Sequence, residues 1–267
     1  MENGFYIYCI RLKTNETIEV RKTISGEGKV QIIPYHDLEA IVSEVSLEEF
    51  GSSEIQKKAE EDLEWIKEKA QIHEDVIEQA MRKGASDIIP VIPMQFGVIF
   101  KTKENLLESL NNNLENFKTS LENLKGKQEW GVKAFLNQKV FEEFLENGNE
   151  EILAKKKEAE SLPKGMAFFA KKQASCKIEE IKARELDKII GEMNENFSPL
   201  SASFHKANIL EKDFTGVEEK MIFNSFYLIG ELKLNNFQRK AEEIKEKYNP
   251  TGIEVFLSGP WPPYHFA

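Results

Sequence analysis

Histidine side chains carry much of the proton transfer and metal binding that proteins perform near neutral pH, and this chain has four of them. They are His36, His73, His205 and His265. His73 and Glu74 begin like the helical motif of zinc proteases, but Ile77 stands where that motif requires a second histidine one turn later. His73 also lies on the apolar stripe of a predicted helix, which favours a buried, hydrogen-bonded structural residue over a proton-transfer role.

Other patterns that could support catalysis are incomplete. The segment Ser25–Lys29 is the nearest approach to a phosphate-binding loop, which requires a glycine where Thr23 stands and a hydroxyl residue where Val30 stands. Cys9 and Cys176 have no histidine nearby in the sequence. The 46 acidic residues fall mainly on the polar faces of predicted helices, where solubility explains them. The sequence therefore predicts a protein that is not an enzyme, with no cofactor and no bound metal.

The segment Ser258–Phe266 carries three of the chain's nine prolines and three large aromatic residues. Proline fixes φ and lacks an N–H donor, so we expect a stiff extended tail over residues 258–267. Two interpretations stay open. Pro260, Trp261 and Tyr264 act as a clasp that packs back on the body of the protein, or Trp261 and Tyr264 form a surface for another protein, because aromatic side chains supply contact area in both settings.

A second adhesive segment is predicted between residues 87 and 100. Its Ile and Val residues favour strands, while Pro90 and Pro93 interrupt any continuous ladder of hydrogen bonds. Such a sequence is typical of a sheet edge, which either resists strand addition or admits one chosen strand. The candidate protein-binding residues here are Pro93, Gln95, Phe96 and Gly97.

Composition limits the possible partners and location. The formal net charge is -10, which disfavours nucleic acid because binding to phosphates rests on Lys and Arg. No apolar run approaches the roughly 20 residues of a membrane helix, so we expect no membrane partner. The N-terminal residues lack the pattern of a secretory signal, and we expect a cytoplasmic protein.

The order of strand and helix patterns predicts an α+β protein of two domains. For residues 1–126 we expect a small sheet from strands at 4–10, 30–35 and 39–45, one long amphipathic helix at 53–84, and a second helix from 106 to 126. For residues 127–257 the predicted order is β-α-β-β-α-β, which is typical of a ferredoxin-like domain. Its elements are strands at 128–136, 200–209, 221–230 and 252–257, a helical insertion at about 140–196 broken near 161–163, and a helix at 233–248. Trp130, in the first of these strands, is expected to be structural.

Several stretches, taken in order, resemble one protein family. They are Tyr6–Tyr8, Asp37–Ser43, Trp65 with Ala70, His73–Glu74, Ile89–Phe100, Glu129–Lys133 and the ending Gly259–Tyr264. Together they span nearly the whole chain and resemble the gas vesicle F/L proteins. Many members of that family have an arginine where Gln95 stands and a serine where His265 stands.

The resemblance implies an accessory or minor structural protein of gas vesicles, which are gas-filled protein shells made by prokaryotes. It also implies that the protein binds the main, very hydrophobic shell protein, contacts other accessory proteins and assists assembly in the cytoplasm. Two alternatives are a scaffold that links several accessory proteins and a ferredoxin-like protein that binds a small ligand.

Overall fold

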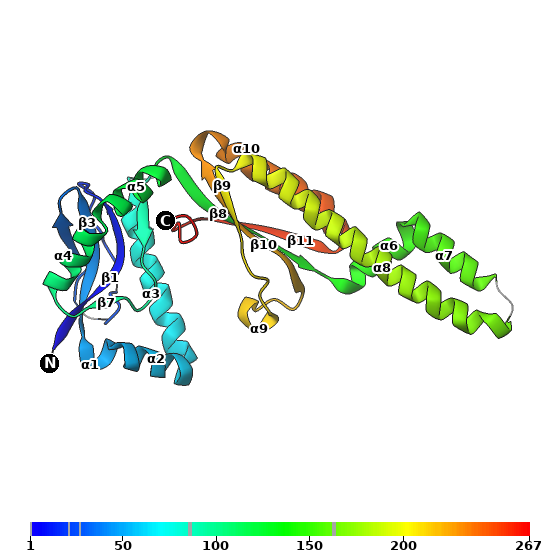
Figure 1. The fold of residues 1–267 in the computed structure, drawn as a ribbon, viewed down its shortest axis with the longest axis horizontal. Helices are drawn as coiled ribbons and strands as arrows, with labels where there is room; N and C mark the ends of the chain where they lie inside the picture. Colours follow the sequence, from blue (N-terminus) through cyan, green and yellow to red (C-terminus); the bar gives the residue numbers. More distant parts are fainter. Residues whose placement is uncertain (1, 21, 27, 85–86, 162–163) are drawn as a thin grey trace. The chain divides into compact units, whose positions relative to one another are not determined.

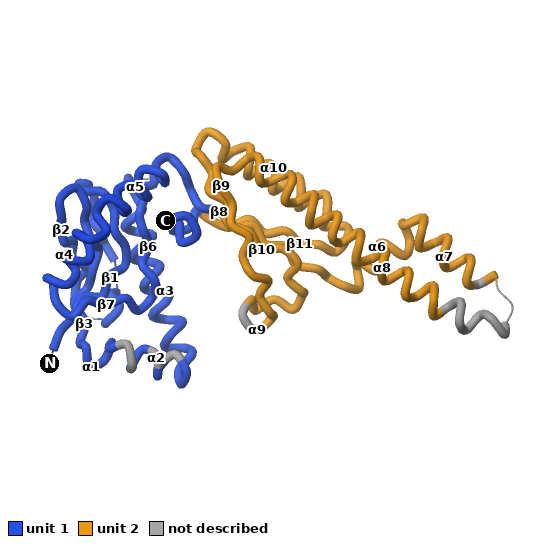
Figure 2. Tube along the Cα trace, in the orientation of Figure 1, with its two compact units in different colours: residues 1–129, 260–267 blue, residues 130–259 orange. Residues whose placement is uncertain are grey.

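The computed structural model describes residues 2–20, 22–26, 28–84, 87–161 and 164–267, and within its helices the side chains of residues 52–53, 56, 59, 160, 164–171 and 213–214 are left out of the description. The fold is a mixture of α-helices and β-strands, which confirms the predicted class at that level. The chain forms two compact units (Figure 2): unit 1 contains residues 1–129 and 260–267, and unit 2 contains residues 130–259. The sequence pattern places the boundaries after residues 126 and 257.

The sheet of unit 1 is built around β1 (Asn3–Leu12), whose residues are buried on both faces. β3 (Leu38–Ser46) pairs antiparallel with one side of β1, and β2 (Gln31–Tyr35) pairs antiparallel with β3. On the other side, β6 (Val91–Pro93) and β7 (Ile99–Phe100) pair with successive parts of β1, also antiparallel. Burial on both faces explains why β1 reads as an almost unbroken aromatic and apolar run.

Two helical layers cover this sheet (Figure 1). The helices of unit 1 are α1 (Leu47–Phe50), α2 (Ser52–Glu61), α3 (Leu63–Met81), α4 (Lys103–Asn112) and α5 (Leu114–Leu124), and a short β4 (Arg82–Lys83) pairs with β5 (Asp87–Ile88). Tyr6 and Tyr8 of β1 share a core with Val76 of α3, whereas Ile7 shares a second core with Leu106 of α4. β1 also has a bulge between Ile7 and Cys9 where it pairs with β3. Ile7 lies in the second of these cores and Cys9 lies in the first.

The expectation of a single helix over 53–84 is wrong, because α2 ends at Glu61 and α3 begins at Leu63. Asp62 lies between them with φ −139° and ψ 83°, and its carboxylate accepts a hydrogen bond from the Trp65 N–H at 3.0 Å. A side chain that caps a helix start competes with continuation of the previous helix. The helix expected to end at Gly126 is likewise divided, at Asn113.

Unit 2 has a four-stranded sheet in the order β11-β8-β10-β9. Its elements are β8 (Lys127–Leu136), α6 (Gln138–Gly148), α7 (Glu150–Glu160), α8 (Lys164–Phe197), η1 (Ser198–Leu200), β9 (Ser203–Lys206), α9 (Lys212–Thr215), β10 (Lys220–Gly230), α10 (Glu231–Tyr248), η2 (Asn249–Thr251) and β11 (Ile253–Trp261). The core lies between the sheet and helices α8 and α10, where Phe197, Tyr227 and Phe237 pack with ring centroids 5.3–5.6 Å apart. Trp130 is buried in this core, with 9% of its surface exposed.

α7 and α8 lie side by side and extend beyond the sheet as a helical arm (Figure 1). The expected break of the insertion at Ser161–Pro163 falls partly on residues 162–163, which lie outside the described ranges.

The strand expected to end at Leu257 continues to Trp261 and so includes Pro260. β11 is the end strand of its sheet, so one of its sides makes no ladder, and a proline is tolerated there. The first part of the proline-rich tail (residues 258–267) is therefore in a strand, and the chain leaves the sheet at Pro262.

Candidate protein-binding site

The buried centre of unit 1 is a chain of hydrogen bonds through His73. The Gly97 N–H donates to the Tyr6 hydroxyl oxygen at 3.2 Å, and that hydroxyl donates to His73 Nδ1 at 2.8 Å. His73 Nε2–H donates to the Met94 carbonyl at 3.0 Å. Every donor in this series of hydrogen bonds meets an acceptor when the His73 imidazole is neutral, so the network fixes the tautomer that carries its proton on Nε2.

Electrostatics favour the same neutral state. Burial lowers the pKa of His73 to about 4, although the Met94 carbonyl acts in the opposite direction. Burial also raises the pKa of the Tyr6 phenol, despite the hydrogen bond from Gly97. Neither group changes its charge near neutral pH, which suits the predicted structural role of His73.

The network holds the segment between β6 and β7 in place. Pro93 pairs with Cys9 and Ile99 pairs with Tyr6, so this edge has three more residues than β1 over the same stretch. The excess is accommodated in a turn at Gln95–Gly97, in which Gly97 has φ +87° and the N–H of Val98 donates to the Gln95 carbonyl. Only glycine adopts that φ without strain.

The candidate side chains in this turn face different environments. The Phe96 ring points inward, with centroids 5.8 Å from the His73 ring and 6.2 Å from the Tyr6 ring, both edge to face. Pro93 is half-buried and Gln95 is exposed. Phe96 therefore packs on the buried side of the turn, and Gln95 is the side chain that the turn presents to solvent.

The C-terminal tail is held on unit 1 by two carboxylates. The Glu129 carboxylate, whose side chain is only 1% exposed, accepts hydrogen bonds from the His265 N–H at 3.1 Å and from His265 Nδ1 at 2.6 Å. The Tyr264 hydroxyl donates to Glu74 on α3 at 2.9 Å. Burial raises the pKa of Glu129, and the hydrogen bonds from His265 oppose that rise. Burial also raises the pKa of Glu74, with an added contribution from nearby acids.

Burial along the tail differs between its prolines and its aromatic rings. Pro262 and Pro263 are buried, whereas Trp261 is 36% exposed, Tyr264 is 41% exposed and Pro260 is exposed. The tail is thus fixed through its prolines and its polar contacts, and it leaves aromatic surface in contact with solvent. Pro260 and Trp261, which the clasp interpretation expects to pack on the body of the protein, are exposed, and the buried residues are Pro262 and Pro263.

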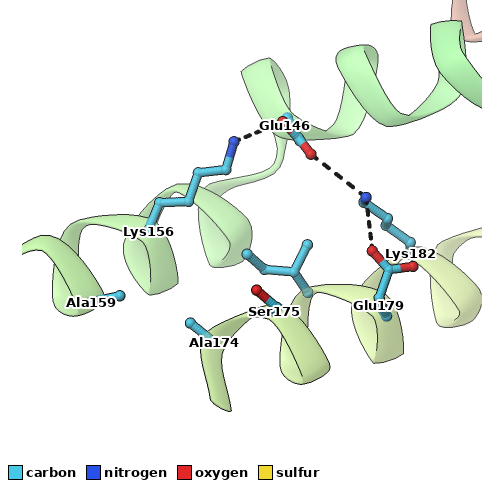
Figure 3. Close-up of a pocket in the computed structure, with 8 residues that line it drawn as sticks. Glu146, Lys156, Ala159, Ala174, Ser175, Glu179 and Lys182 are labelled. Atoms are coloured by element: carbon cyan, nitrogen blue, oxygen red, sulfur yellow. Dashed lines mark hydrogen bonds and ion pairs between the residues drawn. The ribbon is translucent and has the colours of Figure 1, made fainter. Parts of the chain in front are cut away.

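The helical arm of unit 2 carries a pocket of about 420 Å³ lined by residues of α6, α7 and α8 (Figure 3). The Glu146 carboxylate of α6 forms ion pairs with Lys156 of α7 at 2.8 Å and with Lys182 of α8 at 3.5 Å. The Lys182 side chain is 9% exposed and also pairs with Glu142 and Glu179. Burial acts to lower the pKa of Lys182, but these carboxylates raise it overall. The cluster ties three helices together, because each charge at the pocket is paired.

The described residues also bear on metal binding, thiol reactivity and membrane crossing. Among those residues, no group of three His, Cys, Asp or Glu side chains could hold a metal ion. Burial raises the pKa of the Cys9 thiol to about 12, so the thiolate needed for nucleophilic attack does not form near neutral pH. Within the same described ranges, none of the helices has both the length and the apolar character to cross a membrane.

Comparison with known families decides the classification. The sequence model described as gas vesicle synthesis protein GvpL/GvpF matches residues 4–267. The chain belongs to this family.

Relatives and solved structures agree with this assignment to the GvpL/GvpF family. Gas vesicle protein L1 of Halobacterium salinarum is 22% identical, over 100% of this chain and 91% of the relative. Gas vesicle protein L of a Streptomyces species is also 22% identical, over 98% and 92%. The crystal structure of the gas vesicle protein GvpF from an Anabaena species is similar with a TM-score of 0.74, at 20% identity and over 99% of this chain and 98% of that one. GvpF from Microcystis aeruginosa has a TM-score of 0.67, at 18% identity and 98% coverage of both chains.

Two side-chain contacts of this GvpL/GvpF chain are not predicted by its sequence pattern. Glu129 stands in a strand pattern next to Trp130, and nothing in that pattern shows that its carboxylate is buried under the tail. Tyr6 stands in an apolar strand pattern, which gives no partner for its hydroxyl. A signal existed for the second contact, because a buried tyrosine and a buried histidine each require a hydrogen-bond partner.

Proposed function

We propose that this protein is a non-catalytic accessory or minor structural protein of gas vesicles, which binds the main hydrophobic shell protein and assists assembly in the cytoplasm at the vesicle. Membership of the GvpL/GvpF family supports a role in gas vesicle assembly. The observation that carries the binding proposal is the tail, because Trp261 and Tyr264 remain more than one third exposed on a backbone fixed by buried prolines and by Glu129. Large rigid aromatic side chains on a fixed support are typical anchors of protein interfaces.

We infer that the binding surface also includes the turn at Pro93–Gly97 on the same unit. Its backbone is held by the His73 network, and Gln95 is exposed at its tip. A turn fixed in advance loses little conformational freedom when a partner binds, which favours affinity. The proposal therefore places the shell protein on unit 1.

We also infer that unit 2 is a ferredoxin-like domain with a helical insertion. The element order β8-helices-β9-β10-α10-β11 and the strand order β11-β8-β10-β9 support this classification. The insertion supports a second candidate function, which is an adaptor that links accessory proteins. α8 is 34 residues long, and the arm extends beyond the sheet of unit 2.

Co-expression with a tagged shell protein tests the binding proposal in the full-length chain. Trp261→Ala should reduce affinity for the shell protein by about 30-fold, equivalent to about 2 kcal/mol, with little change in melting temperature. Leu63→Ala is the matched control, since Leu63 is 62% exposed on the same unit and lies outside the proposed surface. Equal capture of both variants at wild-type level would remove Trp261 from the interface. Deletion of 150–160 and 164–175 should leave capture of the shell protein unchanged, and loss of bound accessory proteins in that deletion variant would favour the adaptor.

A further inference from the structure

The sheet edges of this protein are protected unequally. β2 contains Pro34, β6 contains Pro93 and β11 contains Pro260. A proline at an edge removes a hydrogen-bond donor that an added strand would need. β9, with the sequence Ser-Phe-His-Lys, is the end strand of the unit 2 sheet and has no proline, and its single charge stands at its last position.

The paired stretch is longer than the four residues of β9. The Ala202 N–H donates to the Leu228 carbonyl at 2.8 Å, and the Ala207 N–H donates to the Asn224 carbonyl at 3.0 Å. Residues 202–207 therefore run alongside β10, over about 20 Å at roughly 3.3 Å a residue. That length is close to the usual length of a complete strand.

The register shows which backbone groups point away from β10. β9 and β10 are antiparallel, with Ser225 opposite Lys206 and Tyr227 opposite Phe204. Ala207 continues this register, because its N–H donates to the carbonyl of Asn224, the residue opposite it, and backbone groups alternate in direction from Ala207 back to Ser203. The Ala202 N–H reaches the carbonyl of Leu228, which lies opposite Ser203, so Ala202 is outside this alternation. The N–H and C=O groups of Phe204 and Lys206 consequently face the outer side of β9, where the described structure places no further strand.

Side chains beside this edge are apolar and accessible. The Phe204 ring stacks on the fully buried Tyr227 ring at 6.2 Å, yet Phe204 is 52% exposed. Ile209 and Leu210 follow, 48% and 38% exposed. A residue on an added strand opposite Phe204 would cover the remaining half of that ring, because directly opposed side chains lie about 5 Å apart.

We propose that the outer edge of β9 captures an extended segment of another polypeptide by strand addition. The occupant is an uncharged or acidic segment without proline, apolar opposite Phe204 and not basic opposite Lys206. A second copy of this chain fits less well, since a stable dimer buries about 1,200–2,000 Å² in total and six paired residues supply only part of that area. The inference concerns unit 2 and does not rest on the proposed role of unit 1.

Amide hydrogen exchange on the full-length protein tests this site. The probe is an acetylated, amidated peptide of alternating threonine and valine, and a peptide of the same length with a central proline is its control. The alternating peptide should slow exchange at least tenfold at the amides of Phe204 and Lys206, with little change at Ser203 and His205, which already face β10. Protection at unit 1 alone, or no protection anywhere, would overturn the proposal.

Three variants at Phe204 and Lys206 distinguish a loss of peptide binding from a loss of folding. Lys206→Pro removes an outward donor without touching the ladder to β10 and should abolish the protection, whereas Lys206→Ala keeps the donor and should retain it. Phe204→Lys serves the same purpose if the proline variant has a lower melting temperature. Unchanged protection in both blocking variants would contradict strand addition. Protection that appears without peptide and grows with protein concentration would assign the edge to a second copy and overturn the present choice of occupant.

Discussion

Unit 1 holds two segments against helix α3 by different chemistry. The turn at Pro93–Gly97 is held by neutral groups, since His73 and Tyr6 join it through hydrogen bonds inside the core. The tail is held by carboxylates, because Glu74 and Glu129 receive the hydrogen bonds of Tyr264 and His265. The first arrangement depends on a histidine that burial keeps neutral, whereas the second depends on two carboxyl groups whose pKa values burial raises. Stability and tail attachment should therefore respond to different perturbations.

His73→Leu should have the largest effect on stability. The change leaves the Tyr6 hydroxyl and the Met94 carbonyl buried without their partner, which should lower the free energy of unfolding by about 4 kcal/mol. Urea unfolding monitored by tryptophan fluorescence measures this loss. Glu68→Gln, at an exposed position of the same helix, should change stability by less than about 0.5 kcal/mol. A loss below about 1 kcal/mol for the leucine variant would show that the network is not needed for the fold.

The two arrangements should also differ in the sign of their pH dependence. Folding lowers the pKa of His73 from 6.5 to about 4, so the unfolded chain takes up this proton first as the pH falls. The stabilisation from neutral His73 is complete above pH 6.5 and is lost towards pH 4, by about 3 kcal/mol at about 1.36 kcal/mol for each pKa unit. Burial raises the pKa values of Glu74 and Glu129, so their contribution changes in the opposite direction and becomes more favourable as the pH falls.

The difference between wild type and His73→Leu isolates the histidine contribution. Unfolding measured from pH 7.5 to pH 4.5 should give a gap between the two proteins that narrows as the pH falls. A gap that stays constant over this range would mean that His73 keeps the same protonation state in both folded and unfolded chains.

Glu129→Ala should release the tail at a smaller cost. The His265 N–H and ring lose their acceptor, and we expect a loss of about 2 kcal/mol together with faster amide exchange at His265. Glu122→Ala on α5 is the control, because its side chain is 68% exposed. Slow exchange at His265 in the Glu129 variant would show that the buried prolines alone hold the tail.

Tyr264→Phe should have the smallest effect. It removes a single hydrogen bond to Glu74 at a position that is 41% exposed, so the free energy of unfolding should fall by less than about 1 kcal/mol. Thermal unfolding checks this value. A loss as large as that of Glu129→Ala would indicate that the Tyr264 and Glu129 contacts contribute equally to the free energy of unfolding.

Periodicity in the sequence predicted most elements of both units, because amphipathic stripes and β-branched runs report burial directly. It missed the divisions at Asp62 and Asn113, where a polar residue ends one helix inside an apolar pattern that continues through it. It also missed the Glu129 contact, since a long-range pairing of residues 129 and 265 leaves no local trace. The partner of His73 required knowledge of which strand lies beside α3. Contacts between distant segments depend on tertiary packing, and a single sequence does not record them.

Pro260–Ala267 belong to unit 1, although all of unit 2 precedes them in the chain. The ribosome must therefore translate every residue of unit 2 before Glu129 can meet His265. When residues 2–129 fold first, the Glu129 carboxylate stays exposed to water until residues 260–267 have been translated. Premature termination late in translation would yield an intact unit 2 attached to an unfinished unit 1.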